Sequence, residues 1–190
     1  RQMCIRDSIN RLAKNGQRYL YYTVNESINR NLPVELALLP FIESQFDPYA
    51  QSSTGASGIW QFILSTAREQ KLKKNWWYDG RRDIVASTDA AFNYLTKLYN
   101  KYDDWLLAIA AYNAGPNRIL KEIKKNKAKG LPTDFWSLKL PRETKAYVPK
   151  LLALLEVIKT PEKFSVVIPN LPNRPYFQLV TLPSQVDLMQ

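Results

Sequence analysis

Residues 34–44 read Val-Glu-Leu-Ala-Leu-Leu-Pro-Phe-Ile-Glu-Ser, a largely apolar segment with a carboxylate, Glu43, beside its end. The helix formers in it predict a helix from Val34 to Ser44, although Pro40 must perturb the backbone hydrogen-bond ladder. A carboxylate among apolar neighbours loses hydration, and such burial raises the pKa of a carboxyl group. A carboxyl group of this kind can act as a general acid near neutral pH. The alternative is an exposed glutamate beside a helix end.

Hydrophobic spacing predicts helix along most of the chain as far as about residue 160. Further helices are expected over about residues 9–30, 59–70, 84–101, 105–114, 116–125 and 142–158, with polar loops at 47–58, 75–80 and 130–141. Asp83 has the character of an N-cap for the longest of these helices, and either Asp103 or Asp104 has it for the next. The sequence therefore predicts an all-α domain of six or seven helices.

The two ends of the chain differ in character from this helical part. After Pro161, several prolines interrupt short β-branched runs, which argues against further helix and predicts an extended tail. Residues 1–8 follow no periodic pattern, and non-native sequence is one interpretation of them. We therefore divide the chain into an N-terminal segment (1–17), a helical domain (18–160) and a Pro-rich tail (161–190). Because the chain lacks an initial Met and stops abruptly, we expect a fragment of a longer precursor.

The composition excludes several kinds of site. The 190 residues include one cysteine, Cys4, and no histidine. Disulfide frameworks, Cys/His zinc sites and Ser-His-Asp or Cys-His catalytic systems are therefore excluded. No stretch has the ~20 apolar residues that a membrane-spanning helix needs. Any catalysis must use carboxylates, tyrosine, lysine, amides or the backbone, and we expect no cofactor and no metal.

The net charge of +10 predicts attraction to a polyanion. Much of the positive charge lies in two clusters, one of Arg118, Lys121, Lys124, Lys125, Lys127 and Lys129, the other of Arg142, Lys145 and Lys150. A nucleic acid, an anionic membrane face and a carboxylate-bearing cell-wall polymer would each match this charge. The first cluster has no interleaved aromatic residues, which argues against nucleic acid. A solvated helix face explains the clusters without any ligand.

Three further segments contain candidate site residues, and the first of them has residue types that are common at sugar sites. Gly55 and Gly58 permit a tight turn and close approach of the backbone to a bulky ligand, and Gln61 follows them with an amide. Trp60 offers a flat apolar surface, although a place in the core is its simpler interpretation. Residues 111–115 read Ala-Tyr-Asn-Ala-Gly and residues 143–148 read Glu-Thr-Lys-Ala-Tyr-Val. Ordinary helix termination explains residues 111–115 without a ligand, and a glutamate that complements the helix dipole explains Glu143.

Taken together and in order, Glu43-Ser44 and these segments resemble the lytic transglycosylases of the soluble-transglycosylase type. The shared pattern is Glu-Ser, Gly-x-x-Gly-x-x-Gln, Ala-Tyr-Asn-x-Gly and Glu-Thr-x-x-Tyr-Val. The flanking stretches 35–40, 78–88 and 133–138 resemble one member of that family in particular. The resemblance covers about residues 18–190. It implies a lysozyme-like multi-helix fold in which residues 18–160 form the catalytic domain.

The resemblance also implies roles for individual residues. Glu43 matches the catalytic acid/base. The implied substrate-binding residues are Ser44, Ser53, Ser57, Gln61, Ile63, Tyr112, Asn113, Glu143 and Tyr147. Ile63 occupies a cleft-lining position where relatives often carry methionine, a difference that should alter packing more than chemistry. Glu143 is implied to support the cleft rather than to transfer protons.

The reaction implied by the resemblance uses one carboxyl group twice. Glu43 protonates the oxygen of the β-1,4 bond between N-acetylmuramic acid and N-acetylglucosamine. It then removes the proton from the muramyl C6 hydroxyl, which attacks C1 and gives a 1,6-anhydromuramyl end without water. Most glycosidases use two carboxylates. Asp47 lies four residues on, but Pro48 disfavours helical geometry there, so a single-carboxylate mechanism suits the sequence better.

Two alternatives stay open, a goose-type lysozyme-like hydrolase of the same bond and a non-catalytic peptidoglycan-binding module. We expect peptidoglycan glycan strands as the partner, no nucleic acid, and a monomer. Membrane association is expected only through a segment outside this chain, and the location is expected to be periplasmic, outer-membrane or cell-wall associated. Relatives usually carry wall-binding repeats after the catalytic domain, and the tail of this chain is expected to lead towards them.

Overall fold

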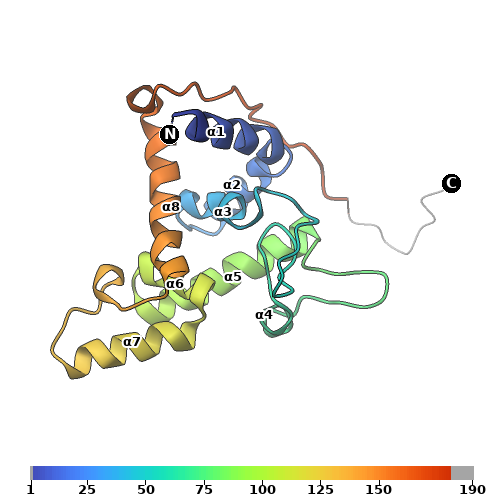
Figure 1. The fold of residues 1–190 in the computed structure, drawn as a ribbon. Coiled ribbons are helices and arrows are strands. Elements are labelled where there is room, and N and C mark those ends of the chain that lie inside the picture. The colour runs from blue at the N-terminus through green and yellow to red at the C-terminus, as the bar shows by residue number, and fades with distance from the viewer. Residues whose placement is uncertain (1, 181–190) are drawn as a thin grey trace.

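The structure is a computed structural model that describes residues 2–180, with side chains from residue 5 onward (Figure 1). The described residues form α1 (Gln2–Gly16), α2 (Leu20–Asn29), η1 (Val34–Leu38), α3 (Leu39–Ser44), α4 (Leu64–Glu69), α5 (Ile84–Tyr102), α6 (Trp105–Ala114), α7 (Pro116–Ala128), η2 (Phe135–Ser137), α8 (Arg142–Lys159) and η3 (Pro161–Phe164), where η marks a 3-10 helix. Isolated bridges occur within residues 2–180, but no strand does. The predicted all-α class is confirmed. The side chain of Cys4 and the tail beyond residue 180 lie outside the described part.

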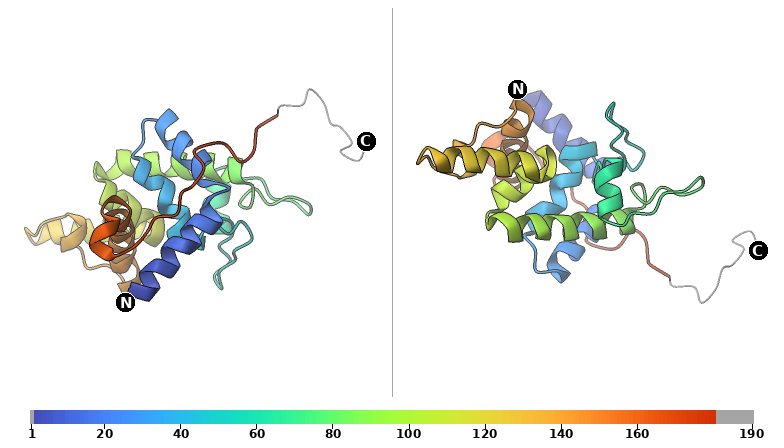
Figure 2. Two further views of the ribbon diagram at one scale, coloured as in Figure 1. Left: turned by 90° about the horizontal axis from the view of Figure 1, so that it is seen from above. Right: turned by 90° about the horizontal axis from the view of Figure 1, so that it is seen from below.

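Helix α6 lies at the centre of the domain. A helix that is apolar on every side is stable only when neighbours cover it all round. Residues 107–111 of α6 are all buried, and α5, α7 and α8 pack against this helix. Figure 2 shows α7 extending away from the rest of the domain. Most of the basic residues of α7 are exposed. The central position of α6 places its last turn, Tyr112 and Asn113, beside α8 and the glycine loop described below.

The caps of the two helices at the centre follow the sequence prediction. The side chain of Asp83 accepts a hydrogen bond from the first turn of α5, and that of Asp104 accepts two from the first turn of α6. Of the two candidates for the second cap, Asp104 is therefore the correct one. Asp103 instead ends α5 in the left-handed conformation, at φ 50°. Each cap satisfies backbone N–H groups that have no partner within the helix.

The segment that carries Glu43 is built from two short pieces. Residues 34–38 form a 3-10 turn, and Pro40 then lies in the first turn of α3, where its missing N–H removes no hydrogen bond. Pro40 therefore begins a helix instead of distorting one. Helix α3 ends at Ser44 because Gln45 and Phe46 both adopt positive φ, at 55° and 59°. The turn leaves Glu43 on the last turn of the helix.

The N-terminal segment differs from the prediction in two ways. The single helix expected over residues 9–30 is two helices, α1 and α2, because Gly16 ends the first and lies against the ring of Phe46. Helix α1 also begins at Gln2, so residues 2–8 are helical and not aperiodic. Ile9 is buried and Ile5 packs against the core, at the i, i+4 spacing of one helix face.

Two other elements differ in length from the prediction. Helix α4 begins at Leu64 and not at Ile59, because Ile59 and Trp60 are buried in a loop and Gln61 has a positive φ of 48°. Helix α7 continues to Ala128, beyond the expected end at about residue 125. None of the helices within residues 2–180 is long and apolar enough to cross a membrane.

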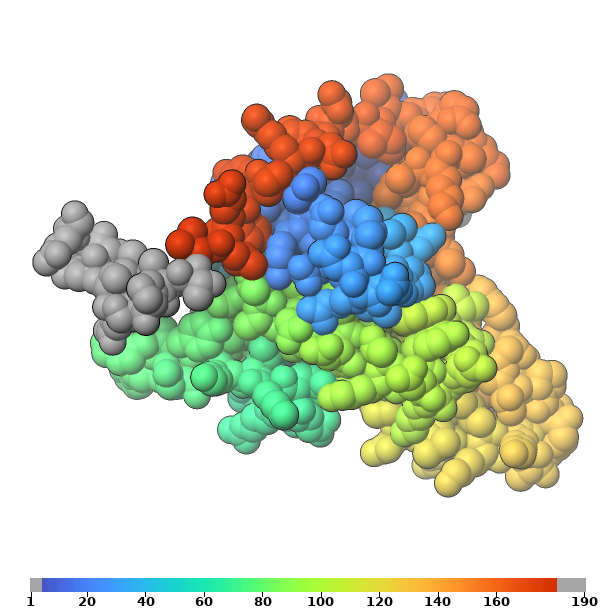
Figure 3. All heavy atoms as spheres, turned by 180° about the vertical axis from the view of Figure 1, so that it is seen from behind, coloured from blue at the N-terminus to red at the C-terminus, as the bar shows by residue number. Residues whose placement is uncertain are grey.

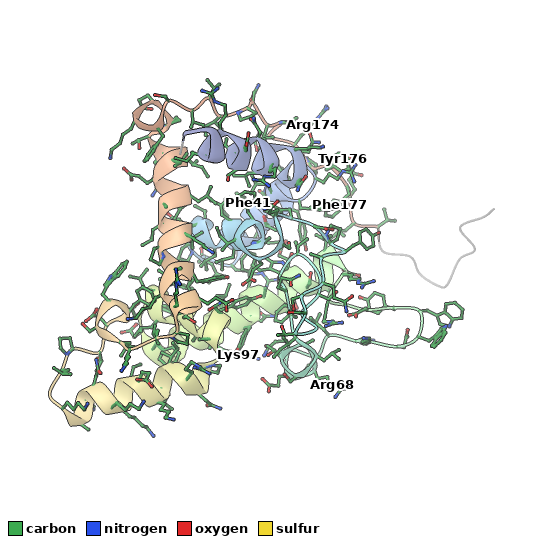
Figure 4. The ribbon with its side chains drawn as sticks, viewed as in Figure 1. Phe41, Arg68, Lys97, Arg174, Tyr176 and Phe177 are labelled. Carbon is green, nitrogen blue, oxygen red and sulfur yellow. The ribbon has the colours of Figure 1, made fainter. Side chains whose placement is uncertain are left out.

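The C-terminal tail begins with η3, a 3-10 helix that the prediction of an extended tail from residue 161 missed, and it is extended from there to residue 180. After η3 it runs back across α1 and α2 (Figures 1 and 3). Its aromatic residues contact that part of the molecule, since the rings of Phe177 and Tyr22 lie 5.3 Å apart and Arg18 lies over the ring of Tyr176 (Figure 4). The tail therefore packs on the helical domain and does not run free from residue 161.

Candidate active site

Glu43 lies on the last turn of α3 and retains partial solvent exposure. Its carboxylate accepts a hydrogen bond from the hydroxyl of Tyr147, which is buried on α8 and 104 residues away in sequence. Burial raises the pKa of Glu43 to about 7; the Tyr147 hydrogen bond acts in the opposite direction, and the charge of Glu143 raises the pKa further. The carboxyl group is therefore balanced between its two protonation states near neutral pH.

Helix α8 presents two residues of the fourth motif to Glu43. Glu143 and Tyr147 are four residues apart, so they lie on the same face of a helix that packs against α3 and α6. Glu143 is exposed in the first turn and acts on Glu43 through its charge, whereas Tyr147 makes direct contact. The structure thus brings together three predicted site residues, Glu43, Glu143 and Tyr147. Tyr147 contacts the Glu43 carboxyl group, and Glu143 affects it only through charge.

Tyr112 occupies the same neighbourhood from α6. Its hydroxyl donates to the backbone oxygen of Trp60 at 2.8 Å, and the rings of Phe62 and Tyr94 pack around it. Burial raises the pKa of the Tyr112 phenol well above its usual range, and the charge of Glu43 raises it further. Tyr112 therefore stays protonated and links the centre of the domain to the loop after α3.

Residues 55–62 form a loop that only a particular glycine permits. Gly58 has a φ of +84°, and a Cβ atom on it would lie 1.7 Å from the backbone oxygen of Arg81. Any side chain at this position would collide with the backbone, because Cβ atoms do not approach other heavy atoms closer than about 3 Å. Gly55 has a similar φ of +82°, but a Cβ there would meet nothing within 4 Å. We call residues 55–62 the glycine loop.

Arg81 holds the glycine loop in place, and the sequence analysis did not single it out. Its guanidinium is buried and donates to the backbone oxygens of Gly55 at 2.7 Å and Phe62 at 3.1 Å. The same guanidinium pairs with Asp79 at 2.7 Å and lowers the pKa of that carboxyl to about 2. The sequence signals for Arg81 were its place in the stretch 78–88 and an acid and a base two residues apart around Gly80, a pattern that is common in surface turns.

The polar side chains of the glycine loop and of α3 are largely used within the protein. The Gln61 amide nitrogen donates to the backbone oxygens of Ala50 at 3.2 Å and Gly58 at 2.9 Å. The Ser44 hydroxyl lies within hydrogen-bond distance of the backbone oxygens of Pro40 and Ile59, at 3.1 and 3.0 Å. These side chains join α3 to the loop. Their predicted contact with substrate stays a prediction.

The other predicted site residues are placed differently. Ser57 is fully buried and accepts a hydrogen bond from Arg82 at 3.2 Å, a position that favours support of the loop over contact with a ligand. Ser53 is exposed in the preceding turn. Ile63 is 43% exposed just before α4, and Asn113 is partly exposed beside Tyr112. Of these, Ile63 and Asn113 present accessible side chains next to buried site residues.

Two interpretations of single residues can be compared directly with the structure. Trp60 is fully buried and its indole N–H donates to Thr88 at 2.9 Å, which confirms its place in the core. Asp47 lies beyond the helix end, and its carboxylate accepts the backbone N–H of Tyr49 at 2.8 Å. It is therefore part of a turn and not one helical turn from Glu43, as the Pro48 argument predicted. Among the described residues, no group of three or more His, Cys, Asp or Glu could hold a metal.

Comparison with known proteins adds a family and relatives. A family model described as "Transglycosylase SLT domain" matches residues 21–134. Membrane-bound lytic murein transglycosylase D of Escherichia coli K12 is 49% identical over 174 residues, which are 91% of this chain and 38% of that protein. A putative tributyltin chloride resistance protein of Alteromonas sp. strain M-1 is 42% identical over 158 residues, 83% of this chain and 76% of that protein.

A solved structure is also similar. It is the X-ray structure of lytic transglycosylase Slt from Pseudomonas aeruginosa, an inactive mutant in which one glutamate is replaced by glutamine. The match has a TM-score of 0.55 at 26% identity and covers 77% of this chain and 24% of that chain. The chain thus spans a small part of this neighbour, and about two fifths (38%) of the E. coli relative.

Proposed function

This chain belongs to the transglycosylase SLT domain family, and from that premise we propose that it cleaves the β-1,4 bond between N-acetylmuramic acid and N-acetylglucosamine in peptidoglycan. Its products would be 1,6-anhydromuramyl ends. The observation that carries the proposal is the Glu43 carboxyl, whose pKa burial raises to about 7 while Tyr147 donates a hydrogen bond to it. The names of the relatives, lytic murein transglycosylases, support the same reaction.

In the first step Glu43 acts as a general acid. A carboxyl group with a pKa of about 7 is substantially protonated at neutral pH, whereas an ordinary glutamate is not. The proton moves to the glycosidic oxygen, the bond from that oxygen to the muramyl C1 breaks, and the bonding electrons leave with the oxygen. The Tyr147 hydroxyl then stabilises the new carboxylate. The positive charge at C1 is taken up by the oxocarbenium ion or by the substrate's own acetamido oxygen.

In the second step the same group acts as a general base. The muramyl C6 hydroxyl attacks C1, and its proton returns to the Glu43 carboxylate, so that the enzyme ends in its starting state. A pKa near neutrality lets one group give and accept a proton, and general acid–base catalysis of this kind contributes about 10² to 10⁴ in rate. Glu143 is exposed and acts on Glu43 through charge, so it does not supply a second catalytic carboxylate.

The remaining acceleration comes from holding the sugar in place. Hydrogen bonds join Ser44 and Tyr112 to the backbone of the glycine loop, and Tyr147 to Glu43, so three helices and the loop are connected around the carboxyl group. We propose that Asn113 and Ile63, whose side chains are accessible, contact the sugar directly. A periplasmic or cell-wall location follows from the proposed substrate, and the monomeric state stays a prediction.

Product analysis tests this function. We expect digestion of purified peptidoglycan to release muropeptides with 1,6-anhydromuramyl ends, which mass spectrometry separates from hydrolysis products by the mass of one water. Reducing ends would instead identify a goose-type lysozyme-like hydrolase using the same acid. Peptidoglycan that stays intact in a zymogram would identify a non-catalytic binding module.

Replacing Tyr147 by phenylalanine tests whether this tyrosine lowers the pKa of the Glu43 carboxyl group. The hydrogen bond lowers the pKa of Glu43, so its removal should raise that pKa above about 7. Because the acid must be protonated to start the reaction, the alkaline limb of the kcat/KM profile should move to higher pH. Loss of a hydrogen bond to a charged group should also slow turnover about tenfold.

The matched control for that variant is Tyr102→Phe. The Tyr102 hydroxyl also donates a hydrogen bond, to the backbone oxygen of Pro116 at 2.7 Å, but it lies between α5 and α7. We expect this variant to keep the alkaline limb of the parent protein. An unmoved limb in Tyr147→Phe would show that the tyrosine does not set the pKa of the catalytic acid.

A further inference from the structure

The connection between α4 and α5 projects from the helical domain and presents aromatic rings to solvent (Figure 1). We call residues 73–80 the aromatic loop. Trp76 is 89% exposed and Trp77 is 90% exposed at its end. Single exposed apolar side chains are ordinary, but adjacent exposed tryptophans form a patch of the kind that marks an interaction site. The mechanism above makes no use of these rings.

The aromatic loop is held in one conformation by its own hydrogen bonds. The Asn75 side chain accepts the backbone N–H groups of Trp77 at 2.9 Å and Tyr78 at 2.8 Å. At the base, the Gly80 N–H donates to the backbone oxygen of Lys73 at 2.8 Å. A binding surface ordered in advance loses less conformational entropy when it binds a ligand. The indole rings are therefore displayed by an ordered loop.

A hollow of about 530 Å³ lies against the aromatic loop and is shared with the loop after α3. Tyr49, 75% exposed, and Gln51 line it from that second loop. Lys74 and Arg82 add positive charge to the same wall, and Asp79 and Asp83 add negative charge. The lining therefore combines exposed aromatic rings, an amide and charged groups of both signs. This is the composition of a site for a ligand that has both apolar faces and polar edges.

Sugar rings of peptidoglycan have these properties. Their faces of C–H bonds pack on flat aromatic rings, their hydroxyl and acetamido groups bond to amides, and the carboxylates of the attached peptides pair with cations. A lipid bilayer also attracts tryptophan and lysine at its surface. However, the concave shape, the amide and the polar groups of the wall fit a glycan better than an apolar phase does.

Arg81 connects this hollow to the candidate active site. It lines the hollow, and it donates to the backbone oxygens of Gly55 and Phe62 at the two ends of the glycine loop. The hollow and the surroundings of Glu43 are thus fixed relative to each other. A glycan strand is long enough to contact more than one such place at once, and binding at a second place increases its effective concentration at the first.

We propose that the hollow lined by Tyr49, Trp76, Trp77 and Tyr78 binds sugar rings of a peptidoglycan strand at a place separate from Glu43. This inference rests on the proposed function for its substrate class. The site holds polymeric substrate on the enzyme and does not take part in bond cleavage. It should therefore affect binding of insoluble peptidoglycan much more than turnover of short soluble fragments.

The test measures binding of the chain to purified insoluble peptidoglycan by cosedimentation, with Glu43→Gln in every sample so that the polymer stays intact. The double variant Trp76→Ala/Trp77→Ala should bind about tenfold more weakly, since two aromatic contacts are removed. Trp136→Ala is the matched control, because Trp136 is 62% exposed on η2, at the opposite end of the molecule (Figures 1 and 2). Trp76→Tyr/Trp77→Tyr keeps the aromatic faces and should retain most of the binding.

The outcomes separate this proposal from the proposed function. Unchanged binding of the double variant overturns the site, as does an equal loss in Trp136→Ala. If the double variant instead loses binding to phosphatidylglycerol vesicles and keeps binding to peptidoglycan, the loop contacts membranes and the proposal is wrong. Whether the protein with Glu43 intact releases anhydromuramyl products is measured separately, so the binding site and the reaction can fail independently.

Discussion

Replacing Glu43 by glutamine is expected to reduce turnover of peptidoglycan by about 10³-fold while the fold is retained. Glutamine has nearly the same size and can still accept the hydrogen bond of Tyr147, but it neither donates a proton to the glycosidic oxygen nor removes one from the C6 hydroxyl. The rate of anhydromuropeptide release measures the loss, and far-ultraviolet circular dichroism checks the fold. The similar Pseudomonas aeruginosa structure is described as inactive after a glutamate-to-glutamine exchange. Residual turnover above about a tenth of the parent rate would remove Glu43 from its role.

The same variant makes a prediction about stability that does not depend on activity. The pKa of Glu43 is raised from 4.5 to about 7 by folding, chiefly through burial, so the folded state holds a proton that the unfolded chain releases. The parent protein should therefore lose stability as pH rises through this interval, whereas the glutamine does not titrate. From pH 4 to pH 8, the unfolding free energy of Glu43→Gln should increase by about 1–3 kcal/mol relative to the parent. Urea unfolding at several pH values measures it. A difference that is constant with pH would contradict a desolvated carboxyl group.

Among substitutions that add one methyl group to the glycine loop, Gly58→Ala is expected to reduce the stability of the protein most. The new Cβ would lie 1.7 Å from the backbone oxygen and 2.7 Å from the carbonyl carbon of Arg81, and the residue already has a φ of +84°. Because both sides of the collision are backbone, either the glycine loop or the backbone at Arg81 must move. We expect the unfolding free energy to fall by about 3 kcal/mol or more, by analogy with other severe steric and strain effects. Activity should fall with it, since the loop carries Gln61 and the backbone oxygen that Tyr112 contacts.

Gly55→Ala separates strain from collision. Its φ of +82° is almost the same, but a Cβ atom there meets nothing within 4 Å. Only the left-handed backbone conformation opposes the change, at about 1–2 kcal/mol. The midpoints of urea unfolding for the two variants should therefore differ clearly, with Gly58→Ala the less stable. Equal destabilisation would mean that the close approach to Arg81 is not what requires glycine.

Local features of the chain could be predicted from sequence where the two interacting groups lie close together in one short segment. Asp83 and Asp104 cap helices that begin one residue later, and the exit from α3 before Pro48 also depends on neighbouring residues. The helix of residues 2–8 was missed although Ile5 and Ile9 have helical spacing, because two apolar positions at a chain end are weak evidence. The break at Gly16 depends on packing against Phe46, thirty residues away, which no window of sequence contains.

In the candidate site, too, the sequence identified some residues, whereas their contacts depend on tertiary packing. Glu43 could be singled out because its apolar neighbours are adjacent in sequence and because the chain has no histidine. The fourth motif could be recognised as a pattern, but not the contact of Tyr147 with the carboxyl group. That contact forms only when α8 packs against α3. Arg81 likewise has no role until two loops meet.

The sequence by itself determined the all-α class, the Asp83 cap and the identity of the carboxyl group to test, and it narrowed the next cap to Asp103 or Asp104. These features depend on residue propensity, residue spacing and composition, which can be known without knowing which segments pack together. Only the tertiary structure decided the protonation balance of Glu43, the requirement for glycine at position 58, and the hollow beside the aromatic loop. The physical reason is that desolvation, steric exclusion and the shape of a surface depend on which segments pack together, and segments far apart in the chain supply those neighbours.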